Sequence, residues 1–278
     1  MSQLIQLKQR INAIASIKKI TQTMRLISMS SHSKLKKQSD SLQRFRNEVK
    51  PMLCALKQGT HESEDQHNAK HKNLFIIFAS EKGLCGNFNS SMFNYFNQHL
   101  TPEALENSHV ISVGKKATGY LQQRHILPLV EFDKVLPNKL EKIAQDLYEK
   151  ISFIHKNYDS IICLSSNPKS FFVQEAQTTI LIPIQPDPCD LENKIVLDEY
   201  QWTQDRQSVT KCMFQILLKT NILLVLTNSM LSEQSARFLS MDSATRSAEN
   251  LLKSMKLTFN KLRQAKITRE LIELISGF

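Results

Sequence analysis

Apolar side chains near the N-terminal end of the chain recur every three or four residues. They are Leu4, Leu7, Ile11, Ile14, Ile17, Ile20, Met24 and Ile27. Lys, Arg, Gln, Ser and Thr fill most positions between them. This spacing lays one narrow apolar stripe along a helix. The pattern therefore predicts a long N-terminal helix whose stripe is packed against protein over its full length.

A second helical pattern, with a period of seven residues, runs through the C-terminal part. One position of the repeat holds Leu217, Leu224, Leu231, Phe238, Thr245, Leu252 and Phe259, and another holds Met241, Ala248, Met255 and Leu262. A period of seven is typical of a coiled-coil seam. Thr220, Thr227 and Gln234 interrupt its first part. They are either devices that fix the register or positions that face something other than the partner helix.

Helix-breaking residues are confined to the middle of the chain. Five of the six glycines and all eight prolines lie between Pro51 and Pro188. Residues 1–50 and 189–276 contain neither type, which fits two long helices. A helix of roughly 70 residues would be about 100 Å long. We therefore expect much of each terminal helix to lie against the other one or inside a partner.

The middle of the chain has the pattern of an α/β domain. Short apolar runs bounded by polar residues or glycine predict buried parallel strands, and helical patterns lie between them. The strands are expected at 73–80, 109–113 and 158–165, the helices at about 90–100, 115–124 and 139–156, and a candidate edge strand at 171–182. This alternation predicts a small domain of βαβ type. The expected division is an N-terminal helix at 1–58, a polar linker at 59–72, an α/β domain at 73–200 and a C-terminal helix at 201–278.

Positive charge is concentrated at the two ends. The 278 residues carry a net charge of +10 with a pI near 9.3. Residues 1–57 have a net charge of +10 and residues 205–278 of +5, which leaves about −5 for the middle. The basic residues thus belong to the two ends of the chain, which suggests that the ends form one functional unit. The net positive charge predicts an acidic partner: nucleic acid, an anionic membrane surface or an acidic protein face.

Cysteine content and hydropathy exclude several classes of protein. The five cysteines are odd in number and include no C-x-x-C pair, so a reducing compartment is expected rather than a disulfide framework or a zinc knuckle. The N-terminal segment is too charged for a signal peptide. The most apolar window, 214–231, is interrupted by polar residues. It is therefore interpreted as a buried helix face rather than a membrane span.

One glycine-rich turn offers candidate chemistry. Gly83, Leu84, Cys85 and Gly86 follow the first expected strand and precede a helix, where backbone N–H groups can hold a phosphate. The Lys-Ser/Thr of a Walker A loop and the pattern G-x-G-x-x-G are both missing. We therefore expect a tight turn that uses glycine for a positive φ. A nucleotide site and a nucleophilic role for Cys85 remain the alternatives.

Two further sites are weighed against simpler roles. Three histidines of the linker lie beside Glu62, Glu64 and Asp65 and could hold a metal, but a solvated linker is the preferred interpretation. They are His61, His67 and His71. The basic N-terminal helix could contact nucleic acid, yet residues 1–43 contain no aromatic residue on which single-stranded bases could stack. No metal or cofactor is expected, and a basic architectural protein with an α/β domain remains the second hypothesis.

Three motifs lie at the two ends and in the centre of the chain. The first is the segment 11–24 (INAIASIKKITQTM), the second is the segment 81–89 (EKGLCGNFN), and the third consists of the segments 232–248 and 259–277. The first resembles the first helix, the second matches the hallmark G-L-C-G-x-x-N, and the third resembles the C-terminal signature of one family. That family is the gamma subunit, the central rotor shaft, of F-type ATP synthases. The resemblance spans the whole chain in the same order.

The resemblance implies a fold and a set of partners. Family members pair their terminal helices as an antiparallel coiled coil, carry a Rossmann-like domain between them and bind no nucleotide in that domain. The coiled coil stands inside a ring of alpha and beta catalytic subunits, and its foot contacts the epsilon subunit and the membrane c-ring. This chain is then expected to be a non-catalytic part of the complex, peripheral to the cytoplasmic side of a bacterial inner membrane.

The resemblance also implies contact residues between rotor and stator. By position in the motifs, Arg237, Gln264, Thr268 and Glu270 are expected to hydrogen-bond with loops of the beta subunit. Met24 and Arg25 correspond to the segment of the first helix that faces the acidic lever of that subunit. The simpler role for all six is solvation of a helix surface. No residue is expected to be catalytic.

Overall fold

The computed structural model describes residues 2–58, 72–100, 108–184 and 205–277. Two long helices dominate it: α1 (Ser2–Gln58) and α7 (Arg206–Ser276). The chain divides into two compact units, residues 1–30 with 237–278 and residues 31–236. Both helices contribute to both units. The expected linker histidines at 61, 67 and 71 lie outside the described residues.

The helix α1 continues through Pro51, beyond the stretch that contains no helix breaker. A proline inside a helix removes one backbone hydrogen bond and costs about 3 kcal/mol. Val49, Leu53 and Leu56, on either side of it, are buried. Val49 and Leu53 pack with Leu217 of α7, so side-chain burial offsets the local cost and the helix persists to Gln58.

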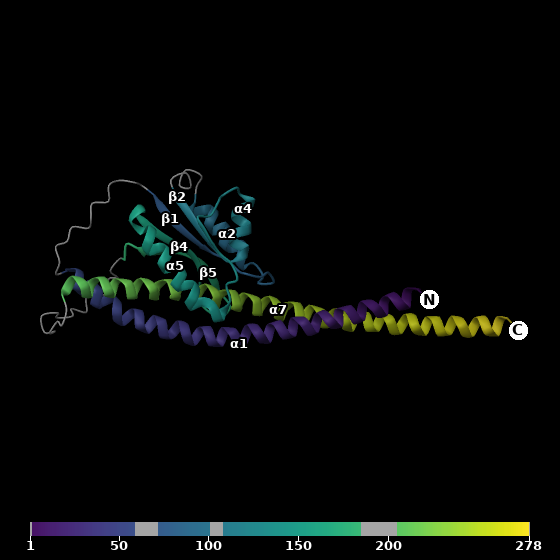
Figure 1. Ribbon diagram of the computed structural model, residues 1–278. Coiled ribbons are helices and arrows are strands. Elements are labelled where there is room, and N and C mark those ends of the chain that lie inside the picture. Colours follow the sequence, from purple (N-terminus) through teal and green to yellow (C-terminus); the bar gives the residue numbers. More distant parts are fainter. Residues whose placement is uncertain (1, 59–71, 101–107, 185–204, 278) are drawn as a thin grey trace. The chain divides into compact units, whose positions relative to one another are not determined.

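Residues 31–236 contain a five-stranded sheet (Figure 1). The strands are β1 (Asn73–Phe78), β2 (Ser108–Val113), β3 (Val130–Phe132), β4 (Ser160–Pro168) and β5 (Gln174–Ile182). They lie in the order β3-β2-β1-β4-β5, with β5 antiparallel to β4 and the other neighbouring strands parallel. The three predicted inner strands and the edge strand are confirmed, and so is the Rossmann-like character of the domain.

Helices cover both faces of this sheet (Figure 1). Alternate residues of β1 point to opposite faces, as strand geometry requires. Phe75 and Ile77 pack with α2 (Phe88–His99) and α4 (Lys115–Gln123). Leu74 and Ile76 join a larger core with α5 (Leu140–Ile154) and α7. Two short 3-10 turns, η1 (Pro137–Lys139) and η2 (His155–Asn157), flank α5.

The apolar part of α7 lies in that larger core. Leu218, Ile222 and Val225 are buried there with α5 and the sheet, as the sequence predicted for the window 214–231. By length and hydropathy α7 also meets the criteria for a membrane span, and 39% of the qualifying window is buried inside the structure.

Within this unit α1 and α7 run antiparallel. The hydroxyl of Ser39 donates a hydrogen bond of 2.6 Å to Oδ1 of Asn228, and Val49 packs with Leu217. The α7 partner therefore has a lower number as the α1 residue number rises. Leu35 of α1 enters the same core as the sheet, so this segment of α1 is part of the α/β unit rather than a free helix.

Candidate functional site

The helix pair of the first unit, residues 1–30 with 237–278, has a seam that differs from the predicted one. The apolar stripe was expected to follow Ile17, Ile20, Met24 and Ile27. Instead, the α1 residues turned toward α7 occupy two positions of a heptad, and each position recurs every seven residues. They are Leu4, Leu7, Ile11, Ile14, Lys18, Thr21, Arg25 and Ser28, all buried or half-buried.

The reason for the error lies in the step after Ile14. A seam of period seven alternates steps of three and four residues, so Ile14 must be followed by residue 18. The apolar residues step from Ile14 to Ile17 instead and thereby leave the seam. Ile17, Ile20 and Ile27 are 53%, 58% and 59% exposed. The prediction of one continuous packed stripe was wrong for this part of α1.

Polar contacts join the two helices where the apolar residues leave the seam. The guanidinium of Arg25 pairs with Asp242 at 2.6 Å, and the ammonium of Lys18 pairs with Glu249 at 2.7 Å. Between them the hydroxyl of Thr245 lies 2.8 Å from that of Thr21, and both residues are buried. These contacts also fix the antiparallel orientation of the pair within this unit.

Both acidic groups of this seam have lowered pKa values. A hydrogen bond from Arg25, and then one from Arg246, holds the pKa of Asp242 below its usual value. A hydrogen bond from Lys18 does the same for the pKa of Glu249. Both carboxyls are therefore ionised at neutral pH, so the polar seam consists of opposite charges in direct contact.

The predicted contact residues of the N-terminal helix lie in two different settings. Arg25 is turned toward α7 and bonded to Asp242. Met24 is half-buried beside it. The surface that faces away from α7 at this level is formed instead by Ile17, Ile20 and Ile27.

Three of the predicted C-terminal contact residues are exposed. Gln264, Thr268 and Glu270 lie on the last turns of α7. The hydroxyl of Thr268 donates to the carbonyl of Gln264 at 3.0 Å, and Glu270 lies 3.4 Å from Lys266. The contacts of Thr268 and Glu270 are short-range ones within their own helix, which an outside partner can replace.

The fourth predicted contact residue differs. Arg237 is 7% exposed and makes a polar or ring interaction within the chain. A partner could reach little of this side chain. Its predicted contact role therefore has less support from the geometry than that of the three exposed residues.

A groove of about 430 Å³ runs between the start of α1 and the last turns of α7 in the first unit. Charged side chains form most of its α7 wall. It is lined by Gln3, Leu4, Leu262, Ala265, Lys266, Arg269, Glu270 and Glu273. Past this groove the apolar residues Leu271, Leu274 and Ile275 are exposed on α7. The predicted contact residue Glu270 thus lies at the edge of an apolar helix end.

The glycine-rich turn lies in the second unit and is a packed structural element. Gly86 has a φ of 59° and Leu84 a φ of 65°, so glycine supplies one of two left-handed positions. Gly83 has open space around its Cα. Cys85 is 2% exposed and packs with Phe88 and Ala236. A buried thiol of this kind is a poor nucleophile.

Asn89 holds this turn together. Its Oδ1 accepts the backbone N–H of Ser80 at 3.0 Å, and its Nδ2 donates to the hydroxyl of Ser80 at 2.7 Å and to Sγ of Cys85 at 3.3 Å. The end of β1, the turn and the first turn of α2 are thereby joined by one side chain. The expected tight turn is confirmed.

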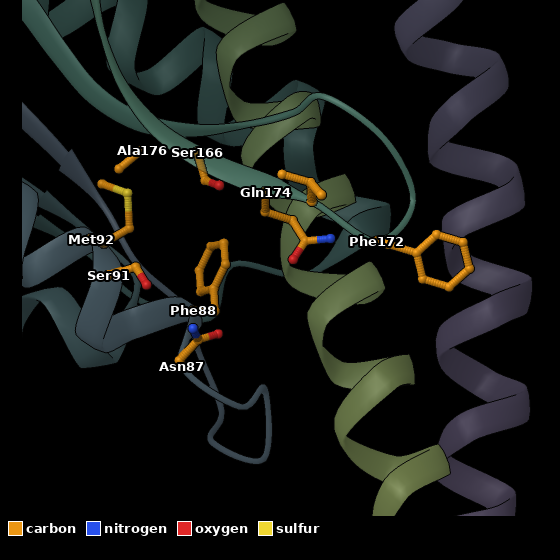
Figure 2. A pocket seen from close by; sticks show the side chains of 9 residues that line it. Asn87, Phe88, Ser91, Met92, Ser166, Phe172, Gln174 and Ala176 are labelled. Carbon is orange, nitrogen blue, oxygen red and sulfur yellow. The ribbon is translucent and has the colours of Figure 1, made fainter.

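A pocket beside this turn occupies the place where Rossmann-like domains bind ligands, at the carboxyl ends of the strands where the strand order reverses. Figure 2 shows its nine lining side chains, which come from the start of α2 and the residue before it, from the end of β4, from the segment before β5 and from the start of β5. None of the nine is charged. Its volume of about 190 Å³ is below the roughly 300–1,000 Å³ of common small-molecule sites.

The described residues were also compared with the possible metal site considered in the sequence. Among residues 2–58, 72–100, 108–184 and 205–277, no group of three His, Cys, Asp or Glu side chains is placed to hold a metal. The linker histidines considered in the sequence are not among these residues.

Comparison with known proteins gives the family. A family model described as ATP synthase matches residues 3–278. The ATP synthase gamma chains of Clostridium novyi (strain NT) and Clostridium botulinum (strain Langeland / NCTC 10281 / Type F) are 30% and 31% identical to it. Each alignment covers 99% of this chain and 96% of the relative. The chain belongs to the ATP synthase gamma family.

Solved structures of the gamma family's complexes share the fold. A chain of the rotor of Euglena gracilis mitochondrial ATP synthase matches with a TM-score of 0.67 at 14% identity, covering 96% of this chain and 99% of that one. A chain from the central stalk and c-ring of the Tetrahymena thermophila enzyme matches with a TM-score of 0.60 at 18% identity, covering 81% and 99%. These matches confirm long terminal helices around a small α/β domain.

Sequence reasoning missed two features of this gamma-family chain. Asn89 closes the hallmark motif, and its spacing from the turn was visible, but an asparagine one turn into a helix has many roles. The polar seam was hidden because Lys18 and Arg25 look like solvated residues beside an apolar stripe. Counting strictly by sevens from Leu4 would have placed both on the seam.

Proposed function

We propose that this chain is the central stalk, or rotor, subunit of an F-type ATP synthase. It transmits rotation from the ion-driven membrane ring to the alpha and beta catalytic subunits, and so couples ion translocation to ATP synthesis or hydrolysis. The observation that carries this proposal is the match to the gamma family over residues 3–278, together with two long helices that run antiparallel in both units. The chain itself catalyses no reaction.

The physical requirement is a stiff, asymmetric element. One charge that crosses a membrane yields about 2.3 kcal/mol per 100 mV, so several must be combined for each ATP. A paired helix can hold that work as torsion and present a different face to each catalytic subunit. Such differential contacts shift a subunit among its conformations.

Exposed apolar side chains support contact with surrounding subunits. Ile17, Ile20 and Ile27 face away from α7, and Leu271 and Ile275 lie on the last turns of α7. Neighbouring apolar side chains on a helix are rarely left in water over such lengths. In the proposal the alpha and beta subunits cover both sets.

The exposure of each side chain supports some of the predicted polar contacts more than others. Gln264, Thr268 and Glu270 are exposed and are proposed to hydrogen-bond with the beta subunit. Met24 is proposed to contact it at the edge of the apolar surface. Arg237 is kept as a proposed contact with less support because it is buried. Arg25 is likewise kept as a proposed contact with less support because its guanidinium is bonded to Asp242.

The remaining partners and the location follow from the same proposal. The epsilon subunit and the c-ring contact the foot of the coiled coil, and the chain is peripheral to the cytoplasmic face of a bacterial inner membrane as part of the complex. The pocket of about 190 Å³ has no role in this proposal.

Membrane vesicles test the function. Vesicles from a strain that lacks this chain are compared with vesicles from the same strain that expresses it, and ATP synthesis driven by an ion gradient is measured. Synthesis is expected only when the chain is present and co-purifies with alpha and beta subunits. Equal synthesis without the chain would refute the proposal.

A paired substitution tests the polar contacts. Gln264→Ala combined with Thr268→Ala should lower coupled ATP synthesis with little loss of assembly, because both side chains are exposed. Lys261→Ala, another exposed position on the same helix, provides the control. Unchanged turnover in the double variant would contradict the contact assignment.

A further inference from the structure

The seam of the first unit contains six polar residues in mutual contact where a coiled coil ordinarily has apolar ones. We propose that this polar segment sets the register in which α1 and α7 pair. Its members are Lys18, Thr21 and Arg25 on α1, and Asp242, Thr245 and Glu249 on α7. The inference concerns the same helix pair as the proposed function, but it can be tested on the isolated chain.

Each polar residue has its partner directly across the seam. Arg25 meets Asp242 at 2.6 Å, Thr21 meets Thr245 at 2.8 Å and Lys18 meets Glu249 at 2.7 Å. Polar side chains within an otherwise apolar seam are a well-attested means of fixing register, at some cost in stability. All three contacts are satisfied together in one register.

A slip of one heptad in one direction places like charges together. Lys18 would then face Lys256 in place of Glu249, because each α7 position is replaced by the one seven residues later. Thr21 would face Leu252, so its partly buried hydroxyl would lose the hydroxyl of Thr245. Arg25 would meet Glu249 in place of Asp242, so one ion pair would be kept. Like charges across an interface repel, and the loss of the other two contacts disfavours this register.

A slip in the opposite direction leaves charges beside apolar groups. Glu249 would face Ile11, and Thr245 would face Ile14. A carboxylate without its cation at a partly buried position loses the compensation for its desolvation. Lys18 would meet Asp242, so one ion pair would be kept here too, but the lost contacts of Glu249 and of the threonine pair disfavour this register as well.

The apolar part of the seam makes this distinction less sharply. Counted by sevens from the bonded threonine pair, Ile14 lies opposite Leu252, and Leu7 lies opposite Phe259. After one slip Ile14 would still lie opposite Phe259 while Leu7 met Lys266; after the other, Leu7 would lie opposite Leu252 while Ile14 met Thr245. Hydrophobic burial is non-directional, so the apolar contact that is kept in each case does not itself select a register.

Arg25 has a role inside the helix pair. It acts on Asp242, which Arg246 also contacts along the same helix. Arg25 is therefore a positioning residue: it holds the two helices in register, while the neighbouring apolar side chains Ile20 and Ile27 form the outward surface.

Disulfide formation in the purified full-length chain measures the register. Three double-cysteine variants are compared. Ile14→Cys with Leu252→Cys reports the observed register, Ile14→Cys with Phe259→Cys reports one slip, and Leu7→Cys with Leu252→Cys reports the other. Peptide mass spectrometry identifies each disulfide despite the native cysteines. In the parent background the first pair should form at least tenfold more disulfide than either other pair.

Three changes to the polar segment are then added to each reporter. Asp242→Arg places a third cation beside Arg25 and Arg246 and should abolish the tenfold preference. Asp242→Arg with Arg25→Asp again gives one acid between two bases and should restore it. Replacing the four charged members by leucine should keep the helix content measured by circular dichroism but reduce the preference below threefold.

The matched control removes an ion pair outside the seam. Asp40→Arg breaks the exposed pair of Asp40 with Lys36 at 2.9 Å on α1 and should leave the register unchanged. The proposal is overturned if Asp242→Arg or the four-leucine variant keeps the tenfold preference. It is also overturned if the exchanged pair does not recover what Asp242→Arg loses. None of these outcomes depends on whether the chain supports ATP synthesis.

Discussion

Replacing Asn89 with alanine should destabilise the α/β unit while leaving the helix pair of residues 1–30 and 237–278 intact. The side chain makes three hydrogen bonds, two to Ser80 and one to Cys85. Both of these residues are buried. Truncation therefore strands polar groups that water cannot reach.

The magnitude follows from these bonds. The two bonds to Ser80 contribute about 1 kcal/mol each, and a buried N–H left without an acceptor costs a further 1–3 kcal/mol or so. The bond to sulfur is weaker. Alanine recovers about 0.5 kcal/mol through its higher helix propensity. We therefore expect the unfolding free energy of this unit to fall by about 3 kcal/mol.

Hydrogen exchange measures this change in the right part of the chain. Peptides that cover β1 and β4 should exchange roughly a hundredfold faster in Asn89→Ala, because each 1.4 kcal/mol corresponds to about a factor of ten. Asn94→Ala is the matched control, since Asn94 lies on the same helix and is exposed. Exchange within threefold of the parent in Asn89→Ala would refute this account of the turn.

Three further predictions follow from particular contacts. Gly114→Ala should destabilise the α/β unit by about 3–5 kcal/mol in a urea titration. The reason is that Gly114 has a φ of +98° and that an added Cβ would lie 2.2 Å from the carbonyl oxygen of Ala79. Gly119→Ala, with open space around the added Cβ, should not destabilise the unit in the same titration. Helix content, measured by circular dichroism, should fall as pH drops below about 4. Asp242 and Glu249 have lowered pKa values in the fold, so the stability that they contribute is lost when they are protonated. The variant Asp242→Asn with Glu249→Gln should not show this fall in helix content. Ile20→Ser should reduce coupled ATP synthesis without lowering the unfolding midpoint of the purified chain, whereas Ile14→Ser on the seam should lower that midpoint, and equal midpoints would contradict the assignment of the two faces.

Much of the fold could be predicted because its signals are local. The absence of glycine and proline from residues 1–50 and 189–276 indicates the long helices, and alternating apolar runs indicate the inner strands. The three-residue strand β3 (Val130–Phe132) was missed because so short a run has no measurable period. The predicted N-terminal helix at 1–58 already passes through Pro51, but the burial of Leu53 and Leu56 that offsets this proline is a tertiary effect, which the sequence does not show.

The site was less predictable than the fold. Gln264, Thr268 and Glu270 were located by their motif, and the structure shows them exposed, but their contacts depend on chains other than this one. Arg25 was expected to face a partner; in the structure it bonds Asp242, 217 residues away in the chain, which the motif did not predict. After Ile14 the next apolar residue is Ile17, whereas a seam of period seven continues at Lys18. This difference of one residue decided which face of α1 meets α7.

The central claim is that this chain turns relative to the catalytic subunits and carries torque between them. A reversible disulfide between Ile20→Cys and a cysteine on the facing surface of a beta subunit in the assembled complex tests it most directly. The account predicts that ATP hydrolysis and ATP synthesis both stop when the disulfide forms and recover when it is reduced. Full turnover with the disulfide intact would contradict it.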